Sequence, residues 1–467
     1  MRIRSTLAAR SALAAALAWT PVPGILAMFG LSWLTPLPAE AQPTAQAAPA
    51  PARPADPLDA LFEAAGRGET AGLERALADP ATGRDRRALL RAALAASRLD
   101  PAAAREPALR RLAAGRDPAL RRAALRIMTS SAFATGDYAE AARAGRLLAE
   151  ALSAAGDAHG AEATARTWRL AALLAPHGRS RVAGPVRPGS IVARRDRVGL
   201  TRVTFSVNGQ PQVAVFDTGA ALSVLSASTA ARLGVRIEEG ATAIGNGVQG
   251  NVQTRIGVAP RVEIAGNVLT NVAFLILDDA SLNFPQVPGG YDIPAIIGMP
   301  EMRALGRIRM EQAGRFTVLP PAAPGEGEEG AANLHAAGNQ LFADVSIGGR
   351  TVPLLLDTGA DRTSLTALYA ESEPARIAAL RTGQANAASA GGTRVQRFAI
   401  WPDAPVALDG RSLTLPQLNI ELPGSGPEPD DNGTLGSDVL RRFESYTLDF
   451  RAMRLRLGAP VEAGSGQ

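Results

Sequence analysis

The sequence contains no cysteine and only three histidines, and aromatic residues make up 4% of the chain. Without cysteine, disulfide bonds, a thiol nucleophile and cysteine-ligated metals are excluded. The histidines, His159, His177 and His335, lie far apart, and neither an HExxH nor a GxSxG motif is present. Zinc-dependent hydrolysis and Ser-His-Asp catalysis are therefore unsupported, and we expect neither a metal nor a cofactor. We expect His335, within the stretch AANLHAAGNQL, to lie in an exposed loop.

Lysine is absent as well, so all 49 basic residues are arginine. The 44 acidic residues reduce the formal net charge to +5, and the arginines are spread through helical segments. Nucleic-acid-binding proteins usually gather basic residues into one stripe and add aromatic residues that stack on bases. Neither pattern is present, and a GC-rich coding bias explains the arginine content more simply. We expect no nucleic-acid partner.

Residues 1–41 have the pattern of a secretory signal peptide: a basic start, apolar stretches and a small-x-small site at Ala39-Glu40-Ala41. This pattern predicts cleavage after Ala41 and export, to a bacterial periplasm. The alternative is an uncleaved anchor, which would be the only association with a membrane. Pro21 and Pro23 interrupt the apolar stretch, whereas a span needs about 20 continuous apolar residues. Residues 42–56 are rich in Pro and Ala, which indicates an extended linker.

Residues 57–178 have helical periodicity, which predicts an all-α region. Three Asp-Pro pairs, Asp56-Pro57, Asp100-Pro101 and Asp117-Pro118, are expected helix starts, because Asp caps free N–H groups and Pro fits the first turn. The stretch ATGDYAEAARAGRLLAEAL resembles part of one tetratricopeptide repeat. We interpret the region either as a surface for a protein partner or as a spacer without a ligand.

The C-terminal part contains the same acidic motif twice. VAVFDTGA gives Asp217-Thr218-Gly219-Ala220, and PLLLDTGA gives Asp357-Thr358-Gly359-Ala360. Each copy follows a pair of short apolar segments joined by a turn with Gly, which predicts a β-hairpin that ends at the Asp.

Two further features recur at similar distances from the motif. An apolar or small pair precedes Gly298 and Gly436, which lie 81 and 79 residues after their Asp (298 − 217; 436 − 357). Between these landmarks are Gly-rich stretches around Gly250 and Gly391, which suit hairpin tips.

On these motifs each half resembles a retropepsin-type aspartic protease unit, the first over 190–322 and the second over 335–459. The resemblance implies an all-β, double-unit acid-protease barrel behind the helical region. It implies that Asp217 and Asp357 form a catalytic dyad and that Thr218 and Thr358 hydrogen-bond across it. It also implies that Gly219 and Gly359 let the backbone approach the carboxyl groups, and that Gly250 and Gly391 lie in flaps over the substrate. Asp361, which has Ala221 as its counterpart, would contact the substrate backbone.

The expected function is therefore that of an exported aspartic endopeptidase with a protein or peptide substrate. Two adjacent carboxyl groups share one proton, so one can act as base and the other as acid. Ala220 and Ala360 provide no hydroxyl donor to the dyad, which predicts a pH optimum of roughly 5 to 7. One alternative is a catalytically inactive protein that binds peptides or partners with the same cleft and helical region. A third interpretation keeps the peptidase and has the helical region shield its cleft or deliver a partner protein.

Overall fold

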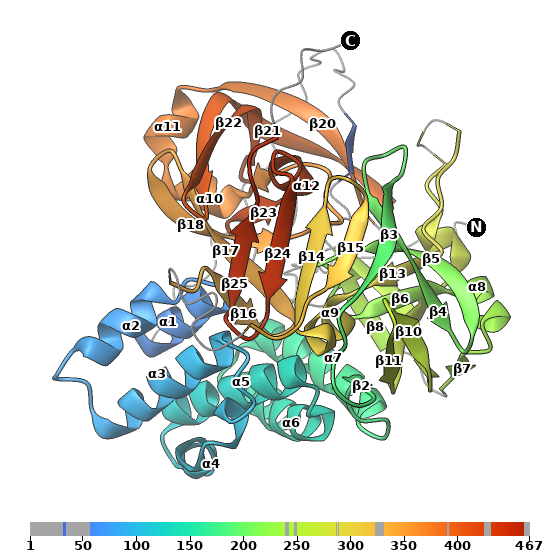
Figure 1. Cartoon of the computed structure of the whole chain (residues 1–467). Coiled ribbons are helices and arrows are strands. Elements are labelled where there is room, and N and C mark those ends of the chain that lie inside the picture. The colour runs from blue at the N-terminus through green and yellow to red at the C-terminus, as the bar shows by residue number, and fades with distance from the viewer. Residues whose placement is uncertain are drawn as a thin grey trace, which may run out of the picture.

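The computed structural model describes residues 31–33, 57–238, 242–246, 250–285, 287, 289–322, 331–389, 392–424 and 431–461. A helical N-terminal part precedes a large β-rich C-terminal part, which confirms the predicted order of the two classes of structure (Figure 1). Across the described part of the chain, no helix is both long and apolar enough to cross a membrane. The expected signal peptide and linker lie outside the described residues, apart from 31–33.

The helical region consists of seven α-helices and one short 3-10 helix. They are α1 (Pro57–Gly66), α2 (Ala71–Ala78), α3 (Arg84–Ser97), η1 (Ala103–Arg105), α4 (Pro107–Ala113), α5 (Pro118–Thr135), α6 (Tyr138–Ala154) and α7 (Ala158–Leu174). α6 and α7 pack side by side, and Gly145 brings α6 close to Trp168 of α7. The resemblance to a tetratricopeptide repeat stays a prediction.

The Asp-Pro pairs do not all start α-helices. The Asp117 carboxylate accepts hydrogen bonds from the backbone N–H groups of Ala119 and Leu120 at 3.0 and 3.1 Å, so it caps α5 as predicted. At Asp100-Pro101 the prediction is wrong, because the Asp100 carboxylate bonds Ala102 N at 2.8 Å in a turn that leads only to η1. The same capping contact therefore serves a turn as well as a helix.

The β-rich part consists of two halves. The first half contains β2 (Arg181–Val182), β3 (Gly189–Arg195), β4 (Thr201–Val207), β5 (Gln210–Phe216), β6 (Ser223–Ser226), α8 (Ala227–Arg232), β7 (Arg236–Ile237), β8 (Thr242–Asn246), β9 (Gly250–Ala259), β10 (Val262–Ile264), β11 (Asn267–Thr270), β12 (Val272–Leu277), η2 (Asp279–Leu282), β13 (Ala295–Ile297), α9 (Met299–Leu305), β14 (Arg307–Glu311) and β15 (Arg315–Val318). The second half contains β16 (Leu334–Ala337), β17 (Gln340–Ile347), β18 (Arg350–Leu356), β19 (Ser364–Leu365), α10 (Ala367–Ser372), α11 (Pro374–Ala378), β20 (Arg381–Ser389), β21 (Gly392–Leu408), β22 (Arg411–Glu421), β23 (Gly433–Leu435), α12 (Ser437–Leu440), β24 (Ser445–Asp449) and β25 (Arg454–Leu457).

The two halves repeat one pattern of strand pairing around the acidic motif. In the first half β5 pairs parallel with β13, β13 antiparallel with β6, and β6 parallel with β12. In the second half β18, β23, β19 and β22 pair in the same senses. Each acidic motif follows the first strand of its set, β5 or β18, so the fold presents the two motifs in equivalent surroundings.

A sheet of strands from both halves joins them. β3, β15 and β14 of the first half continue through β24 and β25 of the second, and these strands lie side by side at the centre of the molecule (Figure 1). A further strand, β1 (Leu31–Trp33), pairs antiparallel with β20, with Ser32 opposite Ala387. β1 lies within the expected signal peptide, so cleavage after Ala41 would remove it from the mature chain.

The central sheet of the first half has two buried faces. Alternate residues such as Ala214, Phe216 and Leu225 pack into the main core of the β-rich part. Their neighbours Val215 and Val224 point the other way and form a second apolar cluster. Because successive side chains of a strand face opposite sides, this second face needs a cover of its own. Helices α5–α7 provide part of that cover.

His335 does not lie in an exposed loop as expected. It is half-buried in β16, where its Nε2 lies 2.8 Å from Asp344 Oδ2 and its Nδ1 lies 3.4 Å from the hydroxyl of Thr70 in the helical region. The Gly- and Ala-rich flanks suggested a loop, but β16 and β17 pair as a hairpin through this stretch.

Candidate active site

Asp217 and Asp357 are held at the ends of buried strands. The Asp217 N–H donates to Ile297 O at 3.0 Å, and the Asp357 N–H donates to Leu435 O at 3.1 Å. Asp217 is 0% exposed and Asp357 is 3% exposed. The fold therefore fixes both carboxyl groups through a neighbouring parallel strand and removes them from bulk water.

The two carboxyl groups meet across the junction of the halves. Each carboxyl group shifts the pKa of the other, and each lies against the glycine of the other motif. A Cβ added to Gly219 would lie 2.6 Å from Asp357 Cγ, and one added to Gly359 would lie 2.6 Å from Asp217 Cγ. Real side chains never come so close, so only glycine permits this approach at both positions.

Thr218 and Thr358 bind the two motif loops together. The N–H of Thr218 donates to Thr358 Oγ1 at 3.1 Å, and the N–H of Thr358 donates to Thr218 Oγ1 at 3.0 Å. Each hydroxyl then donates to a carbonyl of the opposite half, Thr218 to Leu356 O at 2.7 Å and Thr358 to Phe216 O at 2.8 Å. The structure thus brings the six dyad residues predicted from the sequence into one buried cluster.

The electrostatics of the pair are unequal. Burial and the nearby Asp357 carboxylate raise the pKa of Asp217 well above its ordinary value. Burial raises the pKa of Asp357 as well, but hydrogen bonds to its carboxylate oppose the rise. Asp357 Oδ1 accepts from the N–H groups of Gly359 and Ala360 at 2.8 and 3.0 Å. Within the described part of the chain, Asp217 Oδ1 accepts only from the Gly219 N–H, so the additional N–H donor at Asp357 favours the negative charge of the pair there.

A buried oxygen of Asp217 supports the same assignment. Its Oδ1 accepts from the Gly219 N–H at 2.8 Å, but no donor among the described residues reaches its Oδ2. A buried carboxylate oxygen without a donor is costly, whereas a protonated oxygen can donate to the neighbouring carboxylate.

A hydroxyl group and a carboxyl group that are hydrogen-bonded to each other lie near each motif. Ser223 and Thr363 lie six residues after the dyad residues (223 − 217; 363 − 357). The Ser223 hydroxyl bonds Glu301, and the Thr363 hydroxyl donates to Asp438 Oδ1 at 2.6 Å. The same hydroxyls accept from the N–H groups of Gly298 and Gly436 at 2.9 and 3.0 Å.

These two hydroxyl–carboxyl pairs were not predicted from the sequence. The repeated spacing of Ser223 and Thr363 was the available signal, but their acidic partners lie at different distances after the late glycines. Burial raises the pKa of Glu301 to about 7, against an opposing effect of the Ser223 hydroxyl. Burial also raises the pKa of Asp438.

The structure describes two of the three remaining predicted site residues, Asp361 and Gly250. Asp361 forms an ion pair with Arg441, whose Nη1 lies 2.9 Å from Asp361 Oδ1. Gly250 is the first residue of β9 and pairs with Asn246, at the end of the β8–β9 hairpin. Gly391 lies outside the described residues, between β20 and β21.

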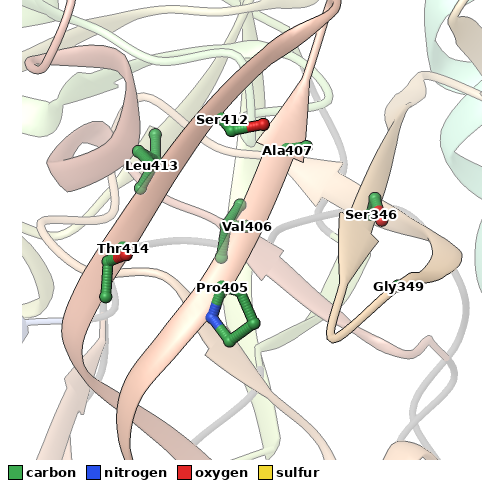
Figure 2. A pocket seen from close by; sticks show the side chains of 8 residues that line it. All are labelled: Ser346, Gly349, Pro405, Val406, Ala407, Ser412, Leu413 and Thr414. Carbon is green, nitrogen blue, oxygen red and sulfur yellow. The ribbon is translucent and has the colours of Figure 1, made fainter.

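Two cavities lie away from the dyad. Figure 2 shows one of about 380 Å³ between the β17–β18 turn and β21–β22, and no titratable side chain lines it. Its lining consists of Ser346, Gly349, Pro405, Val406, Ala407, Ser412, Leu413 and Thr414. The other, of about 620 Å³, lies in the first half beside Arg202 and Tyr291. In the described ranges, no group of three or more His, Asp and Glu side chains is placed to hold a metal ion.

Comparisons with known proteins bear on the first motif. Residues 203–300 match a family model described as "Aspartyl protease", a range that includes Asp217 and ends before Asp357. The first half is similar to aspartyl proteases. Among solved structures, a retropepsin-like aspartic protease from Rickettsia conorii matches with 18% sequence identity and a TM-score of 0.20. The match covers 28% of this chain and 91% of the chain of that protein. No curated protein matches the chain.

Proposed function

We propose that the protein is an aspartic peptidase that hydrolyses peptide bonds with Asp217 and Asp357. The observation that carries this proposal is the contact of two buried carboxyl groups from equivalent halves, with unequal but raised pKa values. Paired carboxyl groups that share one proton provide an acid and a base at the same point. The aspartyl protease match over residues 203–300 supports the same chemistry.

The proposed reaction begins with Asp217 protonated and Asp357 ionised. Asp357 takes a proton from a water molecule, whose oxygen attacks the peptide carbonyl carbon while the Asp217 proton binds the carbonyl oxygen. The tetrahedral intermediate collapses when its C–N bond breaks, the proton on Asp357 passes to the leaving nitrogen and Asp217 takes back a proton from one of the two hydroxyl groups. One product is then a carboxylic acid and the other an amine, and the dyad regains a single proton.

The double-unit acid-protease architecture is part of the proposal. In it each half supplies one Asp-Thr-Gly motif, and the hairpins β8–β9 and β20–β21 act as the flaps around Gly250 and Gly391. Closure of such hairpins would exclude water from the reacting bond. Asp361 is proposed to orient the substrate backbone from the second half.

A peptide-library digest tests the proposal. The full mature chain is compared with Asp217→Asn and Asp357→Asn, which keep the shape of each side chain but remove its acid–base chemistry. We expect each variant to lose cleavage by at least about 10³-fold with an unchanged folded state. Equal cleavage by the wild type and both variants would refute the dyad, and peptide binding without cleavage by all three would favour the inactive alternative.

Export remains a proposal that rests on residues 1–41. N-terminal sequencing of the protein recovered from the periplasm checks it, with residue 42 as the expected first residue. A mature chain that starts at Met1 would leave the apolar segment in place and favour the anchor.

A further inference from the structure

The segments that follow the two catalytic motifs differ in polarity and exposure. After Asp217 the chain continues as Ala220-Ala221-Leu222-Ser223-Val224, in which Leu222 is 1% exposed and Val224 is 0% exposed. After Asp357 the equivalent positions are Ala360-Asp361-Arg362-Thr363-Ser364. The Arg362 side chain there is 49% exposed. One flank of the dyad is therefore apolar and covered, whereas the other is charged and partly open to water.

Helices α5–α7 belong to the same buried apolar cluster as the flank of Ala220–Val224. Phe133, Tyr138 and Leu170 share one buried cluster with Ala220 and Leu222 of the dyad flank. α7 also lies beside β8, so the same helices reach the hairpin proposed as the first flap (Figure 1). The helical region thus lies against the first half on the side where the chain leaves the dyad.

Polar contacts attach the helical region to the second half on the same side. The Gly338 N–H donates to Ser130 Oγ of α5 at 3.1 Å. The next residue, Asn339, donates from Nδ2 to Ala221 O at 2.9 Å, so this turn links α5 to the apolar flank. Farther along, Asn432 donates to Glu69 Oε1, also at 2.9 Å, in the turn between α1 and α2.

The open flank has different neighbours. Gly199 lies against Arg441 and Asp361, because a Cβ added to it would be 2.8 Å from Arg441 Nη1 and 3.0 Å from Asp361 Oδ1. The same turn contains Asp196 and Arg197, which line the cavity of about 620 Å³. No residue of α5–α7 belongs to that cavity lining. This cavity therefore adjoins the turn that lies against Asp361, and its lining includes neither carboxyl group of the dyad.

An interface with the burial of a core does not open readily. Contacts between domains that move are usually more polar than the apolar cluster that α5–α7 share with the first half. Opening it would expose the apolar side chains of Phe133, Leu170 and Leu222 to water, which is unfavourable for each of them. The cover is therefore a fixed part of the site.

We propose that α5–α7 form a wall that closes one end of the substrate site, so that the enzyme cleaves peptides only near one chain end. This inference rests on the proposed peptidase function. An extended peptide bound across the dyad must continue along both flanks, and the helices occupy the flank of Ala220–Val224. The substrate class is then short peptides or accessible chain ends, which departs from the internal cleavage expected from the sequence.

Thiol accessibility tests the wall independently of activity. Because the chain contains no cysteine, an introduced one is the only thiol. Leu222→Cys and Arg362→Cys are matched variants, five residues after their respective Asp (222 − 217; 362 − 357). In the folded full chain we expect Leu222→Cys to react with a maleimide at least about 100-fold more slowly than Arg362→Cys. Similar rates would overturn the wall, whether or not the protein cleaves peptides.

Cleavage position tests the specificity. The wild type is incubated with peptides of roughly ten residues, long enough to extend past both sides of the dyad, with free ends or with either end blocked by a bulky group. We expect release of short fragments from one end only, and loss of that release when the same end is blocked. Cleavage in the middle of doubly blocked peptides, abolished by Asp217→Asn, would overturn the inference but keep the peptidase. Absence of any cleavage that depends on Asp217 would instead refute the proposed function.

Discussion

Thr218 and Thr358 exchange hydrogen bonds across the junction of the two halves, each backbone N–H donating to the hydroxyl of the other residue at 3.1 and 3.0 Å. The partners lie 140 residues apart in the sequence. Each hydroxyl also donates to a carbonyl of the opposite half, so it acts as acceptor and donor together. The four bonds fix the two motif loops relative to each other, and with them the two carboxyl groups.

Removal of one of these hydroxyls should destabilise the whole protein. Thr218→Val keeps the size of the side chain but leaves the Thr358 N–H and Leu356 O without their bonds in a buried site. We expect the free energy of unfolding to fall by about 2–5 kcal/mol, and activity to fall with it. Thr218→Ser keeps the hydroxyl and is the matched control in urea denaturation. Equal stability of the two variants would show that the bonds contribute nothing.

The alanines after the motifs should set the pH dependence. Ala360 provides only a backbone N–H to Asp357, and burial holds the pKa of that carboxyl above its ordinary value. Ala360→Ser adds a hydroxyl that can donate to the ionised carboxylate and so lowers its pKa. We expect the acidic limb of kcat/KM against pH to move to lower pH by roughly 0.5–1 unit. Ala360→Cys has a side chain of similar size but is a weak donor, so it should leave the acidic limb of the pH profile unchanged. A wild-type maximum below about pH 4 would contradict the raised pKa values.

The contact between the two motifs could be predicted from the sequence because both copies occur in the same local pattern. Asp217 and Asp357 each follow an apolar strand, and the Thr-Gly pair behind each Asp is unchanged in both copies. The strand pattern and the short motif together fix where each carboxyl group lies along the chain. That the two carboxyl groups lie next to each other is expected because the two halves are equivalent.

What covers the dyad could not be predicted in the same way. Helical periodicity identifies an apolar face on α5–α7, but it does not say which surface that face meets. The apolar Leu222, where the second copy has Arg362, was a sign that the first flank is covered. The predictions at Asp100 and His335 were wrong for a different reason. A capping side chain or a Gly-rich flank is compatible with several backbone structures.

Glu301 should make stability fall as the pH rises. Burial raises its pKa to about 7, and its Oε1 has no hydrogen-bond partner in the described part of the chain, which favours the protonated form. Because the folded pKa exceeds the unfolded one, the stabilising contribution is complete at acidic pH and is lost as pH rises through about 7. We expect a loss of roughly 3 kcal/mol between about pH 4 and 8 that Glu301→Gln abolishes. Glu150→Gln, on an exposed face of α6, is the control, and an unchanged pH dependence in Glu301→Gln would assign the loss to other groups.

The β-rich part should not be separable from the helices, although the sequence suggests a boundary between residues 178 and 190. Tyr138, Leu170 and Leu174 complete a buried cluster that includes Ala220 and Leu222, so a chain of residues 185–467 would expose that apolar face next to the dyad. Exposed patches of this kind promote association. We expect this fragment to aggregate in light scattering, whereas the full chain without residues 1–41 stays dispersed. A monomeric fragment with native-like stability would show that α5–α7 lie against the dyad flank without stabilising it.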